Sequence, residues 1–562
     1  MRAHPPILWS IAGHDTAGGA GLSADQRAAD ALGVHLCPVV ACVTAQHSLG
    51  VTAVFPLPED QLEAQLQALA LDLPPRAIKT GLLGSVEAVR TVARWVDRLR
   101  EATPVGRDPH QHLALVVDPV LRATAGGSPF SNEAVVQAYR THLLPRATVI
   151  TPNRAEACRL LASPPSEPPP EFSDIPALAD QLLALGVRAT LITGGDVAVD
   201  ANTLTTEADQ SHSLDWLQTP HASGWLTAPR VTTSDTHGTG CTLASGVAAA
   251  LALGHVEADA CVLGKMLTHH ALMNSHAAGH GAGPVMAQPG FATGPAWHGA
   301  PLPRLGLGRS PPWCMAGDAP LFQPFHAPDD GLYGILATSD QIDSALQAGL
   351  RCLQLRHKAR EGLDHHLVRS MALCEAAGAQ LFINDHWREA LSWQAHRSDH
   401  TPPAPGFQLG LHLGQEDLLA LSDADQRTLL AARSHVMLGL SSHSLWELAR
   451  AAGCGASVIA CGPVLPTTTK DMPWQPQGCD NLSWWIRHSP GPVLAIGGLL
   501  SPQDLWPVAA CGPAAVCVVR GLGTSLGDMQ QAVPLLRQAV TQGRDHPTGA
   551  VTSWPHPVLA PT

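Results

Sequence analysis

The chain has 562 residues, a formal net charge of −13, 45% hydrophobic residues and 14% charged residues. This length exceeds what one hydrophobic core supports, so we expect two domains or more. The acidic balance gives no electrostatic reason to expect nucleic acid or an anionic membrane as a partner, and no apolar stretch is long enough to cross a bilayer.

The cysteines and the start of the chain bear on the cellular compartment. The 13 cysteines are scattered, without a C-x-x-C pair or a Cys/His spacing typical of zinc sites. This usage favours reduced thiols in a cytoplasm. The apolar run near the first residue is too short for a signal peptide. We therefore expect a cytoplasmic protein.

The first half of the chain alternates β-type apolar runs with helical stretches, which predicts a parallel sheet covered by helices. The runs cover residues 7–11, 39–44, 77–80, 113–117, 147–150 and 190–193. Two inserts interrupt this pattern. The proline-rich residues 163–170 are expected to form a loop, and residues 201–226 are expected to form a polar excursion.

A glycine-rich loop follows the first of these runs and leads into a helix that carries Asp25. Gln46 follows the second run. Because open parallel sheets bind ligands at the carboxyl ends of their strands, Asp25 and Gln46 are candidates for contacts with one small polar ligand. Taken singly, each could equally be a residue of a helix surface or a turn.

A second glycine loop precedes the Ala- and Leu-rich run 243–253, which predicts a helix. We expect Gly238 and Gly240 on the loop that enters this helix, where backbone N–H groups and the helix N-terminus form an anion site suited to a phosphate in transfer. Cys241 would lie in the first turn, where the same field should lower the pKa of its thiol. The alternative is a glycine loop beside a small buried cysteine.

Seven motifs of the first half, in order, resemble those of the hydroxymethylpyrimidine/phosphomethylpyrimidine kinases of thiamine biosynthesis: AGHDTAGGAGLSAD, VTAQHS, IKTGLLG, VVDPV, TPNRAE, ITGGD and DTHGTGCT. The resemblance covers residues 5–285 and implies a ribokinase-like α/β fold that uses Mg²⁺ and ATP. It implies that the aminopyrimidine lies near Gly13, Asp25, Gln46 and Leu82. It places the ATP phosphates over Gly238, Thr239, Gly240 and Cys241, and assigns the handling of Mg²⁺ and phosphate to Asn153 and Glu156.

Two positions depart from patterns of the wider fold. Cys241 stands where many ribokinase-like sugar kinases carry an aspartate base. A thiolate there could take the proton of the hydroxymethyl group or hold a phosphate already attached. Thr193 stands where several relatives carry lysine, which bears on one nucleotide contact.

The junction of the two halves, residues 281–330, is rich in Gly, Pro and Ala and has no clear periodicity. We interpret it as an interdomain linker, with an extra lobe of the first domain as the alternative. The expected organisation is a first domain over 1–285, a linker over 286–329, a second domain over 330–545 and a tail over 546–562.

Eight apolar runs separated by helix-like stretches fill the second half, which predicts a (β/α)₈ TIM barrel with its active site at the carboxyl ends of the strands. They cover residues 333–338, 352–356, 380–384, 408–413, 435–440, 457–461, 493–496 and 515–519. The insert 396–405 has no role that we can assign.

Polar residues follow these runs, as an active site requires. Asp385 and Asp417 follow neighbouring strands and could hold Mg²⁺. Arg356, Lys358 and Lys470 supply three cations, which suit a pyrophosphate, and the glycines at 497–498 resemble the phosphate site common in such barrels. The alternative is that barrel ends are polar in any case.

The motifs QLRHK, FIND, HLGQED, GLSSHS, GPVLPTTTK and AIGG resemble those of thiamine phosphate synthases, over residues 330–540. The family mechanism is dissociative: pyrophosphate leaves, and the thiazole nitrogen captures the pyrimidine cation. The resemblance implies a pyrimidine site near Gln354 and Ser441 and a thiazole site near Thr467, Thr469 and Gly498. It implies that the pyrophosphate is held by Arg356, Lys358, Asn384, Lys470 and the Mg²⁺ on Asp385 and Asp417.

The sequence therefore predicts an α/β fusion enzyme that binds small molecules. The first alternative is a pyridoxal or pyridoxine kinase, which the AGHD…GGAGLSAD opening disfavours. The second is a barrel that only binds ligands, which the joint presence of Arg356, Lys358, Asp385, Asp417 and Lys470 disfavours. The sequence leaves open whether the chain forms a homo-oligomer.

Overall fold

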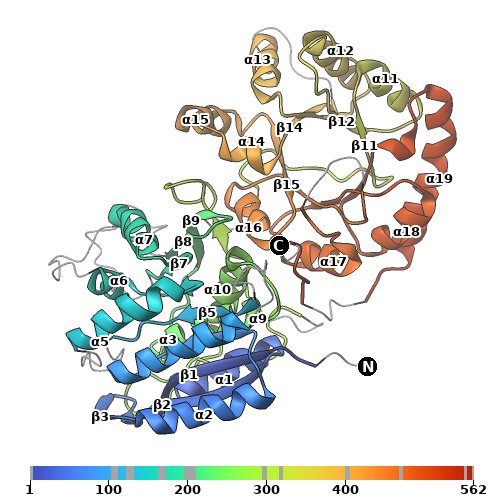
Figure 1. Ribbon diagram of the computed structural model, residues 1–562. Coiled ribbons are helices and arrows are strands. Elements are labelled where there is room, and N and C mark those ends of the chain that lie inside the picture. Colours follow the sequence, from blue (N-terminus) through green and yellow to red (C-terminus); the bar gives the residue numbers. More distant parts are fainter. Residues whose placement is uncertain are drawn as a thin grey trace. The chain divides into compact units, whose positions relative to one another are not determined.

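The computed structural model describes residues 4–102, 112–121, 132–161, 172–194, 211–293, 300–315, 320–398, 405–467, 473–549 and 554–559. The chain divides into two compact units after Pro311 (Figure 1). No helix in the described part of the chain combines the length and the apolar character that a membrane span requires.

The described residues of the first unit form a ten-stranded sheet in the order β10-β9-β8-β7-β6-β5-β4-β1-β2-β3. The six central strands from β2 to β7 run parallel, and the strands at both edges pair antiparallel. The strands are β1 (Ile7–Asp15), β2 (His35–His47), β3 (Gly50–Pro56), β4 (Ala77–Thr80), β5 (Ala114–Val117), β6 (Val149–Ile150), β7 (Ala189–Ile192), β8 (His212–Gln218), β9 (Ser223–Pro229) and β10 (Arg304–Leu305).

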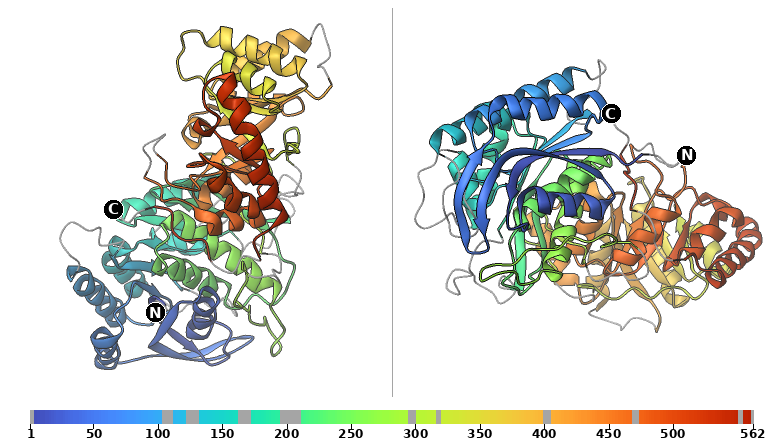
Figure 2. Two further views of the ribbon diagram at one scale, coloured as in Figure 1. Left: turned by 90° about the vertical axis from the view of Figure 1, so that its right-hand side faces the viewer. Right: turned by 90° about the horizontal axis from the view of Figure 1, so that it is seen from below.

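Two groups of helices cover this sheet. Helices α1, α9 and α10 pack against one another, and α2, α3, α5, α6 and α7 pack as a second series of neighbours. Figure 2 (right) shows blue α2 and α3 on one side of the sheet and α1 with the green α9 and α10 on the other. Their bounds are α1 (Gly21–Leu32), α2 (Glu59–Asp72), α3 (Val86–Glu101), α5 (Glu133–Ala138), α6 (Arg154–Leu160), α7 (Ile175–Ala184), α9 (Thr239–Ala252) and α10 (Glu257–Met273).

The sheet is mixed, whereas the sequence predicted a parallel one. The expected polar excursion 201–226 is wrong from residue 211 onward, because β8 and β9 form an antiparallel hairpin there. Trp216 and Trp225 are buried in it with ring centroids 5.2 Å apart. Two tryptophans that bury large apolar surfaces outweigh the polar residues between them. Residues 201–210, the insert 163–170 and most of the insert 396–405 lie outside the described residues.

The described residues of the expected linker 286–329 pack into both units. Strand β10 pairs antiparallel with β9 and so extends the sheet of the first unit. Phe325 is buried in the core of the second unit, where its ring centroid lies 6.0 Å from that of Phe382. The division after Pro311 therefore falls inside the segment that we expected to connect the domains.

The second unit contains a closed barrel of eight parallel strands in sequence order, which confirms the predicted (β/α)₈ architecture. Strand residues spaced by two, such as Tyr333 and Ile335, share its buried core. The strands are β11 (Leu332–Leu336), β12 (Cys352–Leu355), β13 (Gln380–Asn384), β14 (Gln408–Leu413), β15 (Met437–Ser442), β16 (Val458–Cys461), β17 (Val493–Ala495) and β18 (Ala515–Val518). The helices are α11 (Ser339–Gln347), α12 (Leu363–Ala376), α13 (Trp387–Ser398), α14 (Gln415–Leu419), α15 (Asp423–Ala432), α16 (Leu445–Gly453), α17 (Gly478–His488), α18 (Pro502–Ala510) and α19 (Leu526–Asp545).

Candidate active sites

A fully buried ion pair lies below the glycine loops of the first unit. Asp25 accepts hydrogen bonds from Lys79 Nζ at 2.9 Å, Ser10 Oγ at 2.6 Å and Ser245 Oγ at 2.7 Å. Lys79 and Asp25 have no exposed side-chain surface. Protein donors occupy the carboxylate of Asp25, which holds Lys79 and joins three segments of the chain. The expected contact of Asp25 with a ligand stays a prediction.

Lys79 also faces Asp118, which follows β5, with Nζ 3.7 Å from Oδ2. Burial alone would lower the pKa of Lys79, but the neighbouring carboxylates outweigh it and raise that pKa. Burial raises the pKa of Asp118, although Lys79 acts in the opposite direction. Lys79 and Asp118 were not among the predicted site residues, although Lys79 lies near the end of the buried strand β4 and Asp118 directly follows β5.

Cys241 lies in the first turn of α9, near Asp118 and Lys79, whose charges act on its thiol. Gly240 is inside the helix rather than on the entering loop, and Gly238 is the N-cap with φ 89°. A Cβ on Gly238 would lie 2.2 Å from Gly19 O, so the two glycine loops touch backbone to backbone. The expected lowering of the thiol pKa is wrong for the free protein: burial raises the pKa of Cys241 to about 12, and nearby carboxylates add to this effect.

Asp15 and His237 tie the two glycine loops together. Asp15 Oδ2 lies 2.9 Å from His237 Nε2 and accepts hydrogen bonds from the backbone N–H groups of Gly19 and Ala20. Burial alone would raise the pKa of Asp15, but the hydrogen bond with His237 and the backbone donors outweigh it and lower the pKa. Both residues were missed by the sequence analysis, although both lie inside the quoted motifs.

Three of the predicted pyrimidine residues lie at this end of the sheet. A Cβ on Gly13 would lie 3.5 Å from Leu82 Cδ2, so these two residues are direct neighbours. Gln46 Nε2 lies 3.1 Å from His237 Nε2, which places Gln46 beside the second glycine loop. Gly13, Leu82 and Gln46 therefore lie next to the glycine loops. Asp25 is buried below them.

Asn153 and Glu156 form a capping box at the start of α6. Glu156 N donates to Asn153 Oδ1 at 2.9 Å, and Asn153 N donates to Glu156 Oε2 at 3.0 Å. Their contacts in the structure thus fix the loop after β6, and their part in handling Mg²⁺ and phosphate stays a prediction. Thr239 Oγ1 donates to Thr236 O at 2.7 Å, which fixes the loop that enters α9.

A second buried ion pair lies near Gly194, where the sequence has Thr193 in place of a lysine. Lys265 from α10 donates to Asp215 Oδ2 at 2.5 Å, and Gly194 N donates to Asp215 Oδ1 at 3.1 Å. Thr193 N donates to Pro152 O. A lysine is therefore present near Gly194, bound to the same aspartate, but it comes from α10 and not from position 193.

In the second unit, Asp385 and Asp417 lie against each other at the mouth of the barrel. Asp385 follows β13 in a left-handed conformation, φ 65°, which is uncommon for a non-glycine residue. Both residues are exposed, yet neighbouring protein atoms partly desolvate the carboxylate of Asp385. This desolvation and the charge of Asp417 raise the pKa of Asp385.

Paired carboxylates of this kind fit a divalent cation, because a cation between them would relieve their repulsion. Among the described residues no group of three or more His, Cys, Asp or Glu side chains is arranged to hold a metal. Mg²⁺ commonly takes only one or two carboxylates and completes its shell with water and phosphate oxygens. The residues present therefore fit Mg²⁺ bound together with a phosphorylated substrate.

The pyrimidine residues predicted in the barrel are partnered by side chains that the sequence analysis missed. Gln354 Nε2 donates to Tyr333 Oη at 3.3 Å inside the barrel. Ser441 Oγ lies 3.0 Å from His412 Nε2. Burial and Arg356 lower the pKa of His412 to about 4, so this imidazole is neutral at physiological pH. The signal for His412 was its place in the motif HLGQED.

Arg356 directly follows β12, Asn384 is the last residue of β13, and Lys358 is exposed on the loop after β12. A Cβ on Gly498 would lie 2.6 Å from Leu465 Cβ and 2.7 Å from Pro466 O, so the loops after β16 and β17 pack closely beside Thr467. Thr469 and Lys470 lie outside the described residues.

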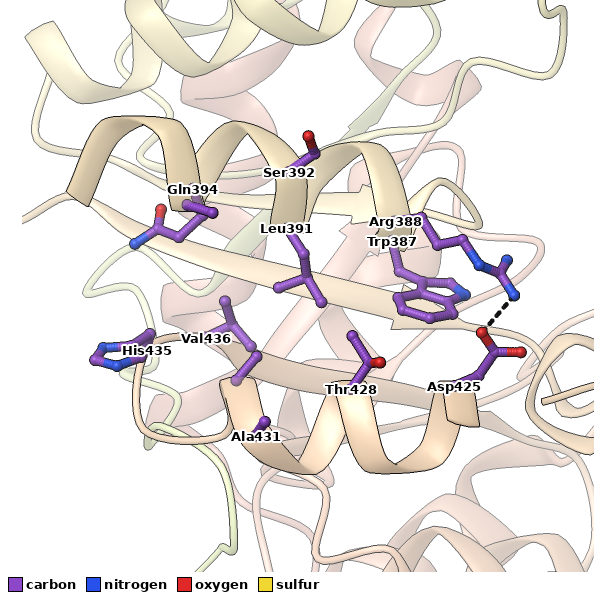
Figure 3. A pocket seen from close by; sticks show the side chains of 12 residues that line it. Trp387, Arg388, Leu391, Ser392, Gln394, Asp425, Thr428, Ala431, His435 and Val436 are labelled. Carbon is purple, nitrogen blue, oxygen red and sulfur yellow. Dashed lines mark ion pairs between the residues drawn. The ribbon is translucent and has the colours of Figure 1, made fainter. Parts of the chain in front are cut away.

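A pocket of about 500 Å³ lies elsewhere in this unit, between α13 and α15 (Figure 3). Leu391 and Val436 line it, and the ion pair between Arg388 and Asp425, 2.7 Å long, lies at one end. None of the predicted site residues lines this pocket. It belongs to the outer helical layer and not to the strand ends.

Comparisons with known proteins assign a family to each unit. The family model described as phosphomethylpyrimidine kinase matches residues 15–286. The family model described as thiamine monophosphate synthase matches residues 334–522. The chain is similar to the chloroplastic thiamine biosynthetic bifunctional enzyme of Arabidopsis thaliana, with 31% identity over 512 residues, which are 89% of this chain and 86% of that protein.

Further relatives match the first half alone. The hydroxymethylpyrimidine/phosphomethylpyrimidine kinase of Streptomyces coelicolor is 37% identical over 281 residues, which are 50% of this chain and 94% of that protein. The solved structure of pyridoxal kinase from Staphylococcus aureus in complex with pyridoxal has 28% sequence identity. It covers 50% of this chain and 93% of that chain, with a TM-score of 0.42.

Proposed function

The chain belongs to the family of bifunctional thiamine biosynthetic enzymes, and from this premise we propose how its residues carry out the two activities. The enzyme combines a hydroxymethylpyrimidine/phosphomethylpyrimidine kinase with a thiamine phosphate synthase. One observation carries this conclusion: the two family matches fall one in each compact unit, and each unit gathers polar side chains at the carboxyl ends of its strands.

For the kinase, we propose ATP as the co-substrate, with its phosphates lying over Gly238, Thr239 and Gly240 at the N-terminus of α9. Gly13, Gln46 and Leu82 would form the rim that receives the pyrimidine. Asp15 and His237 support this arrangement, because they hold the two glycine loops against each other.

We propose that Cys241 faces the hydroxymethyl group. In the free protein its thiol is protonated at neutral pH, since burial raises its pKa. Asp118 lies close enough to influence the pKa of this thiol and has a raised pKa of its own. Asp118 is therefore the adjacent acceptor for the thiol proton if Cys241 is to accept the proton of the substrate, while Lys79 keeps the buried charges balanced.

For the synthase, Asp385 and Asp417 would hold Mg²⁺, which when bound offsets the negative charge of phosphate oxygens. Arg356, Lys358 and Lys470 would grip the same pyrophosphate, so that it leaves as a stabilised anion. Gln354 and Ser441, oriented by Tyr333 and His412, would fix the pyrimidine. Thr467, Thr469 and Gly498 would receive the thiazole phosphate, and Asn384 would lie at the pyrophosphate.

We also propose a cytoplasmic location. In the part of the chain that the structure describes, all 13 cysteines are free thiols, as expected of a reducing compartment. Fractionation of cells that express the full chain tests this; recovery in an oxidising compartment would contradict it.

The experiment that tests the function is a substrate panel. The full chain receives ATP and Mg²⁺ with hydroxymethylpyrimidine, with its monophosphate or with pyridoxal. In a separate arm it receives the pyrimidine diphosphate and thiazole phosphate without ATP. We expect phosphorylation of both pyrimidines and formation of thiamine phosphate and pyrophosphate in the separate arm. Phosphorylation of pyridoxal alone, together with an inactive barrel, would contradict the proposal.

A further inference from the structure

We propose that the C-terminal segment 554–559 is a positioning element of the synthase, which fixes the loop after β16 through Asn481 and Gln477. We call the described parts of this loop, residues 462–467 and 473–477, the β16 loop. The inference rests on the proposed synthase function and goes beyond it, because it assigns a role to a tail that none of the family motifs includes.

The tail and the β16 loop are joined along their backbones. Gln475 N donates to Val558 O at 2.7 Å, and Trp474 forms an antiparallel bridge with Leu559. Val558 is buried, with only 3% of its surface exposed. The tail therefore adds a short strand-like pairing to this loop rather than lying loosely on the surface.

His556 and Asn481 form a reciprocal pair across 75 residues of sequence. His556 N donates to Asn481 Oδ1 at 2.8 Å, and Asn481 Nδ2 donates to His556 O at 3.1 Å. The imidazole ring of His556 contacts Asp480 Oδ2 at 3.1 Å and Pro476 O at 3.0 Å. One tail residue thus contacts both the β16 loop and the start of α17.

Asn481 is linked through Gln477 to His443, which follows β15. Asn481 Nδ2 donates to Gln477 Oε1 at 3.0 Å, and Gln477 Nε2 donates to His443 O at 2.7 Å. Gln477 N donates to Pro463 O at 2.7 Å. Asn481 and Gln477 have no exposed surface. Because unpaired buried amides are unfavourable, this chain of bonds has one arrangement in which every member is satisfied.

The β16 loop meets the candidate phosphate site. Leu465 N donates to Gly497 O at 3.1 Å, and Gly498 packs against Leu465 and Pro466, next to Thr467. Trp474 also fixes the β16 loop, because its ring stacks on that of His443 with centroids 5.4 Å apart and an interplanar angle of 10°. The tail is thereby connected by direct contacts to the backbone that shapes the phosphate site.

This arrangement predicts a specific effect on catalysis. Loss of the tail should leave the barrel strands intact, but it removes the two hydrogen bonds between Asn481 and His556 and the acceptor of Gln475 N. The β16 loop should then sample positions displaced from the productive one, and small displacements of supporting residues lower turnover strongly. We expect the synthase rate at saturating substrate to fall about tenfold or more, while the kinase rate stays unchanged.

The test compares the full chain with a chain that ends at residue 549 and with the variants Asn481→Leu and Asn481→Gln. A chain that ends at residue 559 and the variant Leu535→Ala, an exposed position in α19, serve as matched controls. Synthase kcat and KM are measured on supplied pyrimidine diphosphate and thiazole phosphate, with the kinase rate and the melting curve of each protein. Amide hydrogen exchange is followed over residues 462–478.

We expect the chain ending at 549 and Asn481→Leu to lose kcat and to exchange faster at 462–478, with the barrel still folded. Asn481→Gln should recover part of the rate, because it keeps an amide. Wild-type kcat and exchange in the chain ending at 549 would overturn the proposal. A loss of rate that only follows the loss of folded barrel would also overturn it. If the full chain itself makes no thiamine phosphate, the proposed function fails instead, which this design distinguishes.

Discussion

At the scale of single residues, Cys241 shows how burial can oppose a helix N-terminus. The partial positive charge at the start of α9 favours a thiolate, yet the site is desolvated and lies beside Asp118 and Asp25. Burial is the largest effect, and it raises the pKa of the thiol to about 12. A thiol in this environment becomes a base only when its proton has a nearby acceptor.

Cys241→Ala should lower kinase turnover by about 10²-fold, the usual effect of losing an acid–base group. If Asp118 accepts the thiol proton, the total number of protons on the Cys241–Asp118 pair does not change, so kcat/KM of the wild type should stay level across the neutral range and should not rise with the fraction of free thiolate. Steady-state kinase assays over a pH series measure both effects, with synthase activity as the folding control. Unchanged turnover in Cys241→Ala would return this residue to a packing role.

Asp385 offers a test of the metal assignment. Its pKa is raised by desolvation and by Asp417, so the folded barrel binds this proton more tightly than the unfolded chain does. By linkage, the metal-free barrel loses stability as pH rises from the unfolded pKa, near 3.8, through the higher folded value. At neutral pH Mg²⁺ should recover this stability by binding the ionised pair.

Asp385→Asn should therefore abolish the Mg²⁺-dependent rise of the barrel melting temperature and lower the synthase rate by about 10²–10³. Asparagine is the matched substitution, because it tolerates the left-handed backbone that residue 385 adopts. Thermal melts with and without Mg²⁺, without nucleotide, give the first result and steady-state assays the second. An Mg²⁺ effect that persists in Asp385→Asn would place the metal elsewhere.

At the scale of elements, the barrel could be read from the sequence because its strands are buried on both sides and therefore form unbroken apolar runs. β13 and β14 begin and end at the expected residues, and the other strands deviate only at their ends. The hairpin β8–β9 could not be predicted from the sequence, because the stability of the buried Asp215 in it depends on Lys265 from α10, which is 50 residues away. A local pattern does not contain that partner.

The same limit applies to the sites. Motifs after the strands located the glycine loops and each of Asp385 and Asp417, and the two aspartates come together because neighbouring parallel strands end at one face of the barrel. The partners of Asp25 come from positions 10, 79 and 245, and the burial that sets the pKa of Cys241 is produced by tertiary packing. Residues that act through distant partners, such as His412 and His237, were accordingly missed.

Lys265→Met should destabilise the first unit by about 3–5 kcal/mol, because it leaves the buried carboxylate of Asp215 without its cation. The double variant Lys265→Met with Asp215→Leu should recover most of this loss, since no buried charge remains. Denaturant unfolding of the kinase unit followed by tryptophan fluorescence measures both, helped by Trp216 and Trp225 in the hairpin. Equal destabilisation by the single and double variants would show that packing, and not charge, dominates there.

At the scale of the whole molecule, each unit has its own core, and the division falls after Pro311. Fragments 1–311 and 312–562 should therefore each fold and each keep one activity. Fragment 1–285 should be less stable than 1–311, because it lacks β10 and the hydrogen bond from Trp225 Nε1 to Arg309 O, 3.0 Å long. Circular dichroism, melting curves and the two assays test this; two insoluble fragments would show that the units depend on each other.

One chain should convert hydroxymethylpyrimidine and thiazole phosphate into thiamine phosphate. The most direct measurement is a time course by ³¹P NMR on the full chain with hydroxymethylpyrimidine, ATP, Mg²⁺ and thiazole phosphate. We expect two ADP and one pyrophosphate for each thiamine phosphate, with the pyrimidine monophosphate and diphosphate appearing first. Accumulation of the pyrimidine diphosphate without thiamine phosphate or pyrophosphate would contradict it.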